Sequence, residues 1–411
     1  MPKISNKGDN MPSSPIRKLV PYADKARKQG KHVFHLNIGQ PDLPTPDVFW
    51  KAISEESGST LSYCPSNGYE FYREKFAKYY REFVGIKDVD ADNFIITTGG
   101  SEALIFSIFS TLDAGSEIII PEPMYANYIG FCSSGNINIK PIITSIEKNY
   151  ALPEIAEFEH AITENTKAIL ICNPNNPTGY LYTKEELERL KDIVLKHDLF
   201  LFVDEVYREF TYGGEFYSIL NFEELKDHVI VIDSISKRFS ACGARVGAIV
   251  SRNQEVLDTC LKFAQARLSP PSLGQIGGAA LFDLGKDYYD SVKEEFSARR
   301  DFLVGRLLNM EGVLCPQPGG AFYLLVKLDV DNTDKFCQWL LESFEYEGST
   351  VMLAPGSGFY STPGLGQYEA RIAYVLKEED LAKAMDCLEN AIKEYKTNVM
   401  TSDSVFDQTL S

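Results

Sequence analysis

Residues 199–204 read LFLFVD, an apolar run that stops at a single carboxylate, Asp204. Short apolar runs of the same kind, bounded by turn residues, alternate with stretches of helical periodicity from about residue 93 to residue 250. We expect strands at residues 93–98, 117–121, 138–142, 168–172, 199–204, 229–234 and 246–250. Apolar strands that alternate with helices are typical of a largely parallel sheet covered on both sides. The sequence therefore predicts an α/β fold with a mostly parallel, seven-stranded sheet.

Helix signals lie between and after these strands. Residues 183–196 have helical periodicity, and Thr183 with Glu186 three residues later forms the pattern of a capping box. After Asn253 the pattern changes to long helices, including a charged one from about residue 288 to 310. Further strands are expected near 321–328 and 370–375.

The chain is long enough for two domains, because 411 residues exceed what one compact core usually holds. We expect a large domain over residues 48–295 and a smaller α+β domain over 296–396. Residues 1–47 contain several prolines and are expected to lie along both domains as an extended arm that completes the small domain. Residues 397–411 are expected to form a flexible tail.

Composition excludes several classes of function. The chain has 41 basic and 58 acidic residues, a net charge of −17, so nucleic acid is not an expected partner. No apolar run approaches the roughly 20 residues that span a bilayer, and the N-terminal MPKISNKGDN lacks an apolar signal core. We therefore expect a cytoplasmic protein without a membrane partner. The eight cysteines stand singly, which favours reduced, mostly buried thiols and no metal site.

The segment SISKRFSACGARVG (234–247) directly follows an apolar strand. Lys237 could form an imine with an aldehyde, while Ser234, Ser236 and Arg245 could bind a phosphate dianion. Taken alone, the string is better explained by a solvated Lys-Arg pair after an edge strand. The other strand ends favour the catalytic interpretation.

TTGGSEAL (97–104) runs from a strand through two glycines into a helix, where free backbone N–H groups and the helix dipole can hold a phosphate. ICNPNNPTGY (171–180) fixes a turn that holds Asn176 at another strand end. A plain strand–helix connection and an ordinary Asn-Pro turn are the alternatives for these two segments considered singly.

VDEVYREF (203–210) puts Asp204 at the carboxyl end of its strand, where open α/β sheets usually place ligands. A carboxylate there needs a positively charged partner, and the protonated ring nitrogen of pyridoxal 5′-phosphate (PLP) is one. Tyr207 could then reach the phenolic oxygen of the ring. An Asp that caps a helix is the alternative.

In this order, the segments resemble the class I/II aminotransferases of PLP fold type I, and the resemblance covers the chain apart from its two ends. It implies that Lys237 holds PLP as a Schiff base and that Asp204 pairs with the pyridine nitrogen. Asn176 and Tyr207 would hydrogen-bond the phenolic oxygen. The phosphate would be bound by Ser234, Ser236, Arg245, Gly100 and Ser101.

Two more segments extend the resemblance around the cofactor. PEPMYANY (121–128) matches the family segment whose tyrosine lies over the ring, which nominates Tyr125. YCPSNGYEFYR (63–73) is similar to the segment whose tyrosine reaches the phosphate of the neighbouring subunit. Tyr63 therefore implies a homodimer with shared active sites, although a core aromatic and a surface aromatic would explain these two residues equally well without the family context.

The substrate side is carried by LNIGQPDLPTP (36–46) and ARIAYV (370–375). The resemblance implies that Gly39 and Asn176 lie close to the substrate and that Arg371 grips the α-carboxylate with its guanidinium fork. Without this context, a surface salt bridge would be the simpler role for the arginine.

The implied reaction is a ping-pong amino transfer in which Lys237 both anchors PLP and moves the Cα proton. Aspartate or alanine is the favoured donor, and 2-oxoglutarate is the favoured acceptor. RLSPPSLGQ (267–275) is similar to a segment of alanine aminotransferases, so Arg267 is either a substrate residue or a structural one. One subgroup of aspartate aminotransferases carries a lysine just after the glycines of the phosphate turn, where this chain has Ser101 and Glu102.

Two other functions fit the same scaffold. A PLP-dependent lyase that cleaves a C–S bond would begin with the same proton abstraction, and release of pyruvate and ammonia without an oxo acid would identify it. A PLP-binding transcription regulator would need a DNA-binding module, and the roughly 45 residues before the catalytic fold are fewer than an independent domain usually has.

Overall fold

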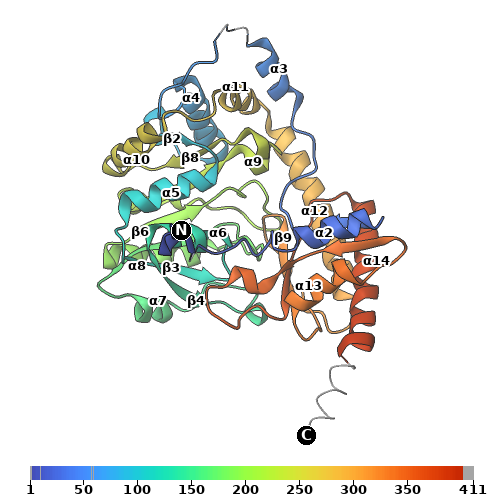
Figure 1. Cartoon of the computed structure of the whole chain (residues 1–411). Coiled ribbons are helices and arrows are strands. Elements are labelled where there is room, and N and C mark those ends of the chain that lie inside the picture. The colour runs from blue at the N-terminus through green and yellow to red at the C-terminus, as the bar shows by residue number, and fades with distance from the viewer. Residues whose placement is uncertain (1, 10, 57, 59, 401–411) are drawn as a thin grey trace.

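The computed structural model describes residues 2–9, 11–56, 58 and 60–400, and its largest element is a seven-stranded sheet (Figure 1). In spatial order the strands are β2 (Phe94–Thr97), β8 (Gly247–Val250), β7 (Val229–Ser234), β6 (Phe200–Asp204), β5 (Thr166–Cys172), β3 (Glu117–Glu122) and β4 (Asn138–Ile143). Every neighbouring pair is parallel except the two that involve β8. The prediction of a mostly parallel, seven-stranded sheet is confirmed.

Helices cover both faces of this sheet (Figure 1). The helices between residues 47 and 308 are α3 (Asp47–Glu55), α4 (Glu70–Tyr79), α5 (Gly100–Thr111), α6 (Asn127–Gly135), α7 (Ile155–Ala161), α8 (Lys184–His197), α9 (Ile235–Arg238), α10 (Gln254–Arg267), α11 (Ser272–Leu281) and α12 (Lys286–Leu308). The capping box predicted for α8 is present: the Thr183 hydroxyl accepts from the Glu186 N–H at 3.2 Å, and the Glu186 carboxylate accepts from the Thr183 N–H at 2.8 Å.

Burial on two faces explains why the strands read as continuous apolar runs. In β6, Phe202 packs into one core cluster, whereas Leu201 and Val203 pack into the other, and all three side chains are fully buried. Successive side chains of a strand point to opposite faces, so a sheet covered on both sides needs apolar residues at every position. Asp204, at the end of this run, is a buried carboxylate among apolar residues, so it needs a hydrogen-bonding or positively charged partner.

The second region contains two small sheets and two long helices. The antiparallel sheet consists of β11 (Ala354–Pro355), β12 (Glu369–Ala373) and β9 (Tyr323–Lys327), and the parallel pair consists of β1 (His32–His35) and β10 (Ser349–Met352). The accompanying helices are α13 (Thr333–Glu342) and α14 (Glu378–Tyr395). Strands occur where 321–328 and 370–375 were predicted; the domain boundaries given above stay predictions.

The expectation of an extended N-terminal arm is wrong for its second half. Besides the short α1 (Asn6–Asp9), the arm contains α2 (Val20–Lys28) and β1. Pro21 lies in the first turn of α2, where a missing N–H leaves no hydrogen bond unmade, and Ala23 and Ala26 bury one face of the helix. Of the expected tail, residues 397–400 belong to a π-helical turn (Lys396–Met400), and 401–411 lie outside the described residues.

The part of the chain that the structure describes contains neither a candidate membrane span nor a candidate metal site. No helix there is both long enough and apolar enough to cross a bilayer, and no group of three or more His, Cys, Asp or Glu side chains is arranged to hold a metal ion. The eight cysteines are free, and seven of them are buried.

Candidate active site

A cavity of about 580 Å³ opens at the carboxyl ends of β5, β6 and β7. Parallel strands bring these ends to one edge of the sheet, where open α/β folds bind ligands. Every site residue predicted from the sequence lines this cavity except Tyr63 and Arg267. The predicted residues that line it are Gly39, Gly100, Ser101, Tyr125, Asn176, Asp204, Tyr207, Ser234, Ser236, Lys237, Arg245 and Arg371.

One end of the cavity has the features of a phosphate site. The chain turns at Gly99, with φ of 76°, into the first turn of the 12-residue helix α5. A Cβ at Gly99 would lie 2.4 Å from Nη2 of Arg245, so glycine is needed both for the turn and for the close approach of the guanidinium. Arg245 donates to the carbonyls of Thr98 (3.3 Å) and Cys242 (3.2 Å) and has no carboxylate partner among the described residues. A cation beside a helix N-terminus suits a phosphate dianion.

Asp204 fits the ring nitrogen of PLP. Its carboxylate is 5% exposed and accepts from the Tyr128 hydroxyl at 2.8 Å and from the Val206 N–H at 3.4 Å. No cation of the described chain lies within ion-pair distance, and burial raises the pKa of Asp204 to about 6. A protonated ring nitrogen would provide the positive charge that this buried carboxylate lacks.

Lys237 lies in the short helix α9, directly after β7, so the end of the strand places its amine in the cavity. The Nζ atom donates to the carbonyl oxygen of Gly39 at 2.8 Å. A Cβ at Gly39 would lie 1.5 Å from the hydroxyl oxygen of Tyr323. Only glycine therefore lets this carbonyl reach the lysine.

Three polar side chains of the cavity lining, those of Asn176, Tyr207 and Tyr323, are hydrogen-bonded in a row. The Asn176 amide donates to the Tyr207 hydroxyl at 3.5 Å, and the Tyr207 and Tyr323 hydroxyls are 3.1 Å apart. Burial raises the pKa of the Tyr207 hydroxyl well above its usual value, so the group stays neutral and can donate a hydrogen bond.

Arg371 is a buried cation that has no counterion among the described residues. Its side chain, 2% exposed, donates to the Asn176 amide oxygen at 2.9 Å and to the carbonyl of Asn37 at 2.5 Å, while Nε has no partner. The guanidinium lies 4.4 Å from the ring centre of Tyr323 and 4.9 Å from that of Phe359. Burial lowers the pKa of Arg371, because nothing anionic nearby stabilises the charge. The carboxylate of a bound ligand would supply the missing negative charge.

Two predicted residues lie outside the cavity lining. Tyr63 is 80% exposed on the surface. Arg267 is held by the Glu102 carboxylate at 3.1 Å and by the carbonyls of Ser66 (3.0 Å) and Ile96 (3.3 Å). These bonds favour the structural role for Arg267 over the substrate role.

Several lining or supporting residues were not predicted. Tyr128 follows Tyr125 by one helical turn, a spacing that could have indicated a shared face. Tyr323 belongs to a predicted strand, but its contact with Gly39 could not be inferred from either segment. The other unpredicted lining residues include Arg17, Asn37, Asn127 and Cys242.

Directly behind the site is a group of buried charges that we name the buried ion cluster. Its members are Glu205, Arg208, Glu209, Asp233 and Arg238. Glu205 follows Asp204, Arg208 follows Tyr207, Asp233 precedes Ser234 and Arg238 follows Lys237. Each of these pocket residues is therefore covalently joined to a member of the cluster.

Ion pairs connect the buried ion cluster internally. Arg208 lies 2.8 Å from the Asp233 carboxylate and 3.1 Å from that of Glu205. Arg238 contacts Asp233 closely and lies 3.3 Å from Glu209. Burial raises the pKa values of Glu205 and Glu209 to about 7.

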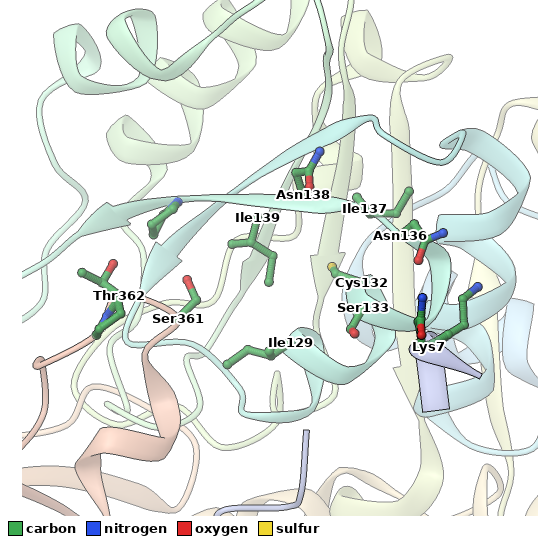
Figure 2. Close-up of a pocket in the computed structure, with 13 residues that line it drawn as sticks. Lys7, Ile129, Cys132, Ser133, Asn136, Ile137, Asn138, Ile139, Ser361 and Thr362 are labelled. Atoms are coloured by element: carbon green, nitrogen blue, oxygen red, sulfur yellow. The ribbon is translucent and has the colours of Figure 1, made fainter. Parts of the chain in front are cut away.

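A larger hollow, of about 790 Å³, lies between α6 and β4 beside α1 (Figure 2). Apart from Lys7, its lining side chains are uncharged, and Lys7 donates to the Ser134 carbonyl at 2.8 Å. The lining holds no paired acid and base, so the smaller cavity around Lys237 remains the candidate active site.

Comparison with known proteins identifies the family. The family model "Aminotransferase class I and II" matches residues 31–388. An aspartate aminotransferase of Thermotoga maritima is 32% identical, over 94% of this chain and 98% of the relative. The solved alanine aminotransferase of Pyrococcus furiosus is 30% identical with a TM-score of 0.87, over 95% of this chain and 100% of that one. An aromatic-amino-acid aminotransferase of Thermococcus litoralis is 29% identical, over 96% of this chain and 99% of the relative.

The family match spans both the large sheet and the second region, and it includes Lys237, Asp204 and Arg371. The chain therefore belongs to the class I and II aminotransferases, and it is a transaminase that uses pyridoxal phosphate.

Proposed function

We propose that Lys237, Asp204 and Arg371 form the catalytic centre of this transaminase. One observation carries the proposal: a buried carboxylate without a cation and a buried guanidinium without an anion line the same cavity as a strand-end lysine. The ring nitrogen of PLP and the α-carboxylate of an amino acid would supply the two missing charges.

Bound PLP supplies an electron sink that makes the proton on the substrate Cα acidic. Lys237 holds the cofactor between turnovers and, when released from it, takes and returns this proton through Nζ. Asp204 keeps the ring nitrogen protonated, and Arg371 orients the substrate through its carboxylate. The Gly39 carbonyl accepts a hydrogen bond from Nζ at 2.8 Å and so fixes the position of the amine.

The remaining predicted residues would fix the cofactor in place. Tyr207 and Asn176 would bind the phenolic oxygen, and Tyr125 would lie against the ring. The phosphate would be held by Gly100, Ser101, Ser234, Ser236 and Arg245.

We propose aspartate or alanine as donor and 2-oxoglutarate as acceptor. Relatives named as aspartate and alanine aminotransferases support both donors, and the excess of positive side chains in the cavity suits an acidic acceptor. A cytoplasmic location remains a prediction from the sequence.

We also propose a homodimer with shared active sites. Helices α3, α4 and α11 lie at the top of Figure 1, and several large apolar side chains on α3, on α4 and on the segments that precede α4 and α11 are exposed. They are Trp50 (59% exposed), Leu61 (65%), Tyr63 (80%), Phe71 (42%) and Leu268 (54%). The hydroxyl of Ser66 donates to the Leu268 carbonyl at 2.6 Å, which holds the Tyr63 segment beside Leu268. Large exposed apolar patches mark interfaces, and a second copy would bring Tyr63 to its neighbour's phosphate site.

The absorbance spectrum of the PLP-loaded protein tests the catalytic proposal. Aspartate, alanine, glutamate and an aromatic amino acid are added one at a time; a productive donor should remove the band of the lysine-bound cofactor, and 2-oxoglutarate should restore it. Lys237→Ala should abolish this conversion, whereas Lys262→Ala, an exposed lysine on α10, should not change it.

Conversion by the Lys237→Ala variant at near wild-type rate would refute the role of Lys237. If the wild-type enzyme releases pyruvate and ammonia when no oxo acid has been added, the reaction is that of a lyase.

A further inference from the structure

Residues 36–46, which we name the crossing segment, lead from the second region of the molecule to helix α3 (Figure 1). At one end, the Leu36 N–H donates to the last carbonyl of β10 at 3.0 Å. At the other end, the Thr45 hydroxyl donates at 2.7 Å to a carbonyl in the chain that follows α9. The Gly39 carbonyl, which accepts from Lys237 Nζ, lies between these two attachments.

Few hydrogen bonds hold the middle of the crossing segment. Pro41 and Pro44 have no N–H group to donate. Apart from the Gly39 carbonyl, the only group of residues 38–44 that is hydrogen-bonded to the rest of the described chain is the Asp42 carboxylate. We therefore expect the position of the Gly39 carbonyl to depend on Asp42, three residues away.

A buried arginine holds Asp42. Its carboxylate accepts from Nη1 of Arg299, on α12, at 2.7 Å, and the arginine side chain is 3% exposed. Nε of the same guanidinium donates to the Glu295 carboxylate, one turn earlier in α12, at 2.8 Å. The guanidinium also lies 5.1 Å from the ring centre of Phe296. These contacts fix the guanidinium, so it can fix Asp42 in turn.

The same nitrogen connects the crossing segment to the strand that carries Arg371. Nη1 of Arg299 also donates to the Val375 carbonyl at 2.7 Å, and Val375 lies two residues after the end of β12. Arg299 is not part of the cavity lining, so it can affect a bound ligand only through the groups that it holds.

We propose that Arg299 is a positioning residue that acts through Asp42. The pair keeps the Gly39 carbonyl in place, and this carbonyl aligns Lys237 for transfer of the Cα proton. The inference rests on the proposed function, in which Lys237 moves this proton. A misplacement of about 1 Å can slow an enzymatic step roughly 100-fold. Loss of the contact between Arg299 and Asp42 should therefore slow proton transfer more than it weakens binding.

A crystal structure of the cofactor-free Asp42→Ala variant tests the geometry without turnover. The variant removes the contact but keeps the buried arginine, and the Gly39 carbonyl should move out of hydrogen-bond distance of Lys237 Nζ, from which it lies at 2.8 Å in the wild type. Asp88→Ala is the matched control, because Asp88 pairs with Arg252, another buried arginine outside the cavity lining. The control should leave the Gly39 carbonyl in place.

Conversion of the PLP-loaded protein by donor alone tests the proton transfer. With aspartate or alanine, Asp42→Ala should convert the cofactor roughly 10- to 100-fold more slowly than wild type. Cleavage of the Cα–H bond should be the slowed step, so deuterium at Cα should slow the variant at least as much as it slows wild type. Asp42→Asn, whose amide oxygen can still accept from Arg299, should recover part of the rate.

Ligands that cannot react isolate binding. In 2-methylaspartate and 2-methylalanine a methyl group replaces the Cα hydrogen, so neither can lose a Cα proton. Spectral titration of the PLP-loaded protein should give dissociation constants for Asp42→Ala within about twofold of wild type, because Arg371 and its strand keep their contacts.

The two proposals can fail separately. If wild-type protein converts no donor, the proposed function and this inference both fall. If wild-type protein reacts, a Gly39 carbonyl that stays in place in Asp42→Ala, or conversion by this variant at the wild-type rate, refutes the role of Arg299. A smaller isotope effect, or a loss of affinity for the methylated ligands that matches the loss of rate, refutes it as well. In these cases the proposed function stands.

Discussion

Replacing Asp204 by Asn should make the cofactor-free protein more stable at neutral pH. The carboxylate is buried without a cation, and burial raises its pKa from 3.8 to about 6. Because the folded pKa lies above that of the unfolded chain, the native state loses stability as pH rises from about 4 to about 6, and the loss is complete above pH 6. Asn has the same shape, can keep hydrogen bonds to Tyr128 and Val206, and carries no charge.

The size of the effect follows from the two pKa values. At about 1.36 kcal/mol per pH unit, the ionised carboxylate destabilises the native state by about 3 kcal/mol at pH 7 and by about 1.6 kcal/mol at pH 5. The stability advantage of Asp204→Asn should therefore widen by about 1.3 kcal/mol between pH 5 and pH 7. Urea unfolding of both cofactor-free proteins across this range measures it.

A matched control is available in the buried ion cluster. Asp233 is equally buried but pairs with Arg208 at 2.8 Å and with Arg238, so Asp233→Asn should destabilise the protein by removing the carboxylate that two buried guanidinium groups share. PLP should reverse the order for Asp204, since its ring nitrogen supplies the missing charge only to the wild type. An Asp204→Asn variant that is no more stable than wild type at pH 7, or whose advantage does not change with pH, would refute the reasoning.

Three further outcomes follow from the site. Arg371→Lys keeps the charge but loses the fork that reaches Asn176, so steady-state kcat/KM should fall roughly 10- to 100-fold for every amino acid; an unchanged value would contradict the α-carboxylate role. Gly39→Ala places a Cβ 1.5 Å from the Tyr323 hydroxyl and should slow cofactor conversion by displacing the carbonyl that holds Lys237, whereas Gly305→Ala, which meets nothing within 4 Å, should not. Tyr63→Ala should weaken PLP retention in a spectral titration, because the proposed dimer brings Tyr63 to its neighbour's phosphate site; full retention would argue against sharing between subunits.

The sheet was predictable because each strand is apolar on both faces and ends at a turn residue. Residues 229–234 were expected as a strand, and β7 has these bounds. The place of the cavity in the fold was predictable for the same reason. Asp204 stands at a strand end and Lys237 next to one, and the apolar pattern predicts where these strands end.

Long-range contacts account for what sequence reasoning missed. Arg267 is fixed by Glu102, 165 residues away in the sequence, and nothing in either segment indicates that pairing. The overlap between Gly39 and Tyr323 depends on how β9 meets the N-terminal part of the chain. The prolines of the arm favour extended chain when they are considered alone, but a proline in a first helical turn, such as Pro21, is compatible with a helix.

The buried ion cluster has a consequence for how the enzyme acquires its cofactor. Its salt bridges join residues of the chain to one another, and its members are the immediate chain neighbours of Asp204, Tyr207, Ser234 and Lys237. We therefore expect these four side chains, which belong to the proposed cofactor site, to be oriented before PLP binds. Binding of PLP should then cost little free energy for ordering the chain. The cofactor-free enzyme should therefore rebind PLP quickly and without refolding.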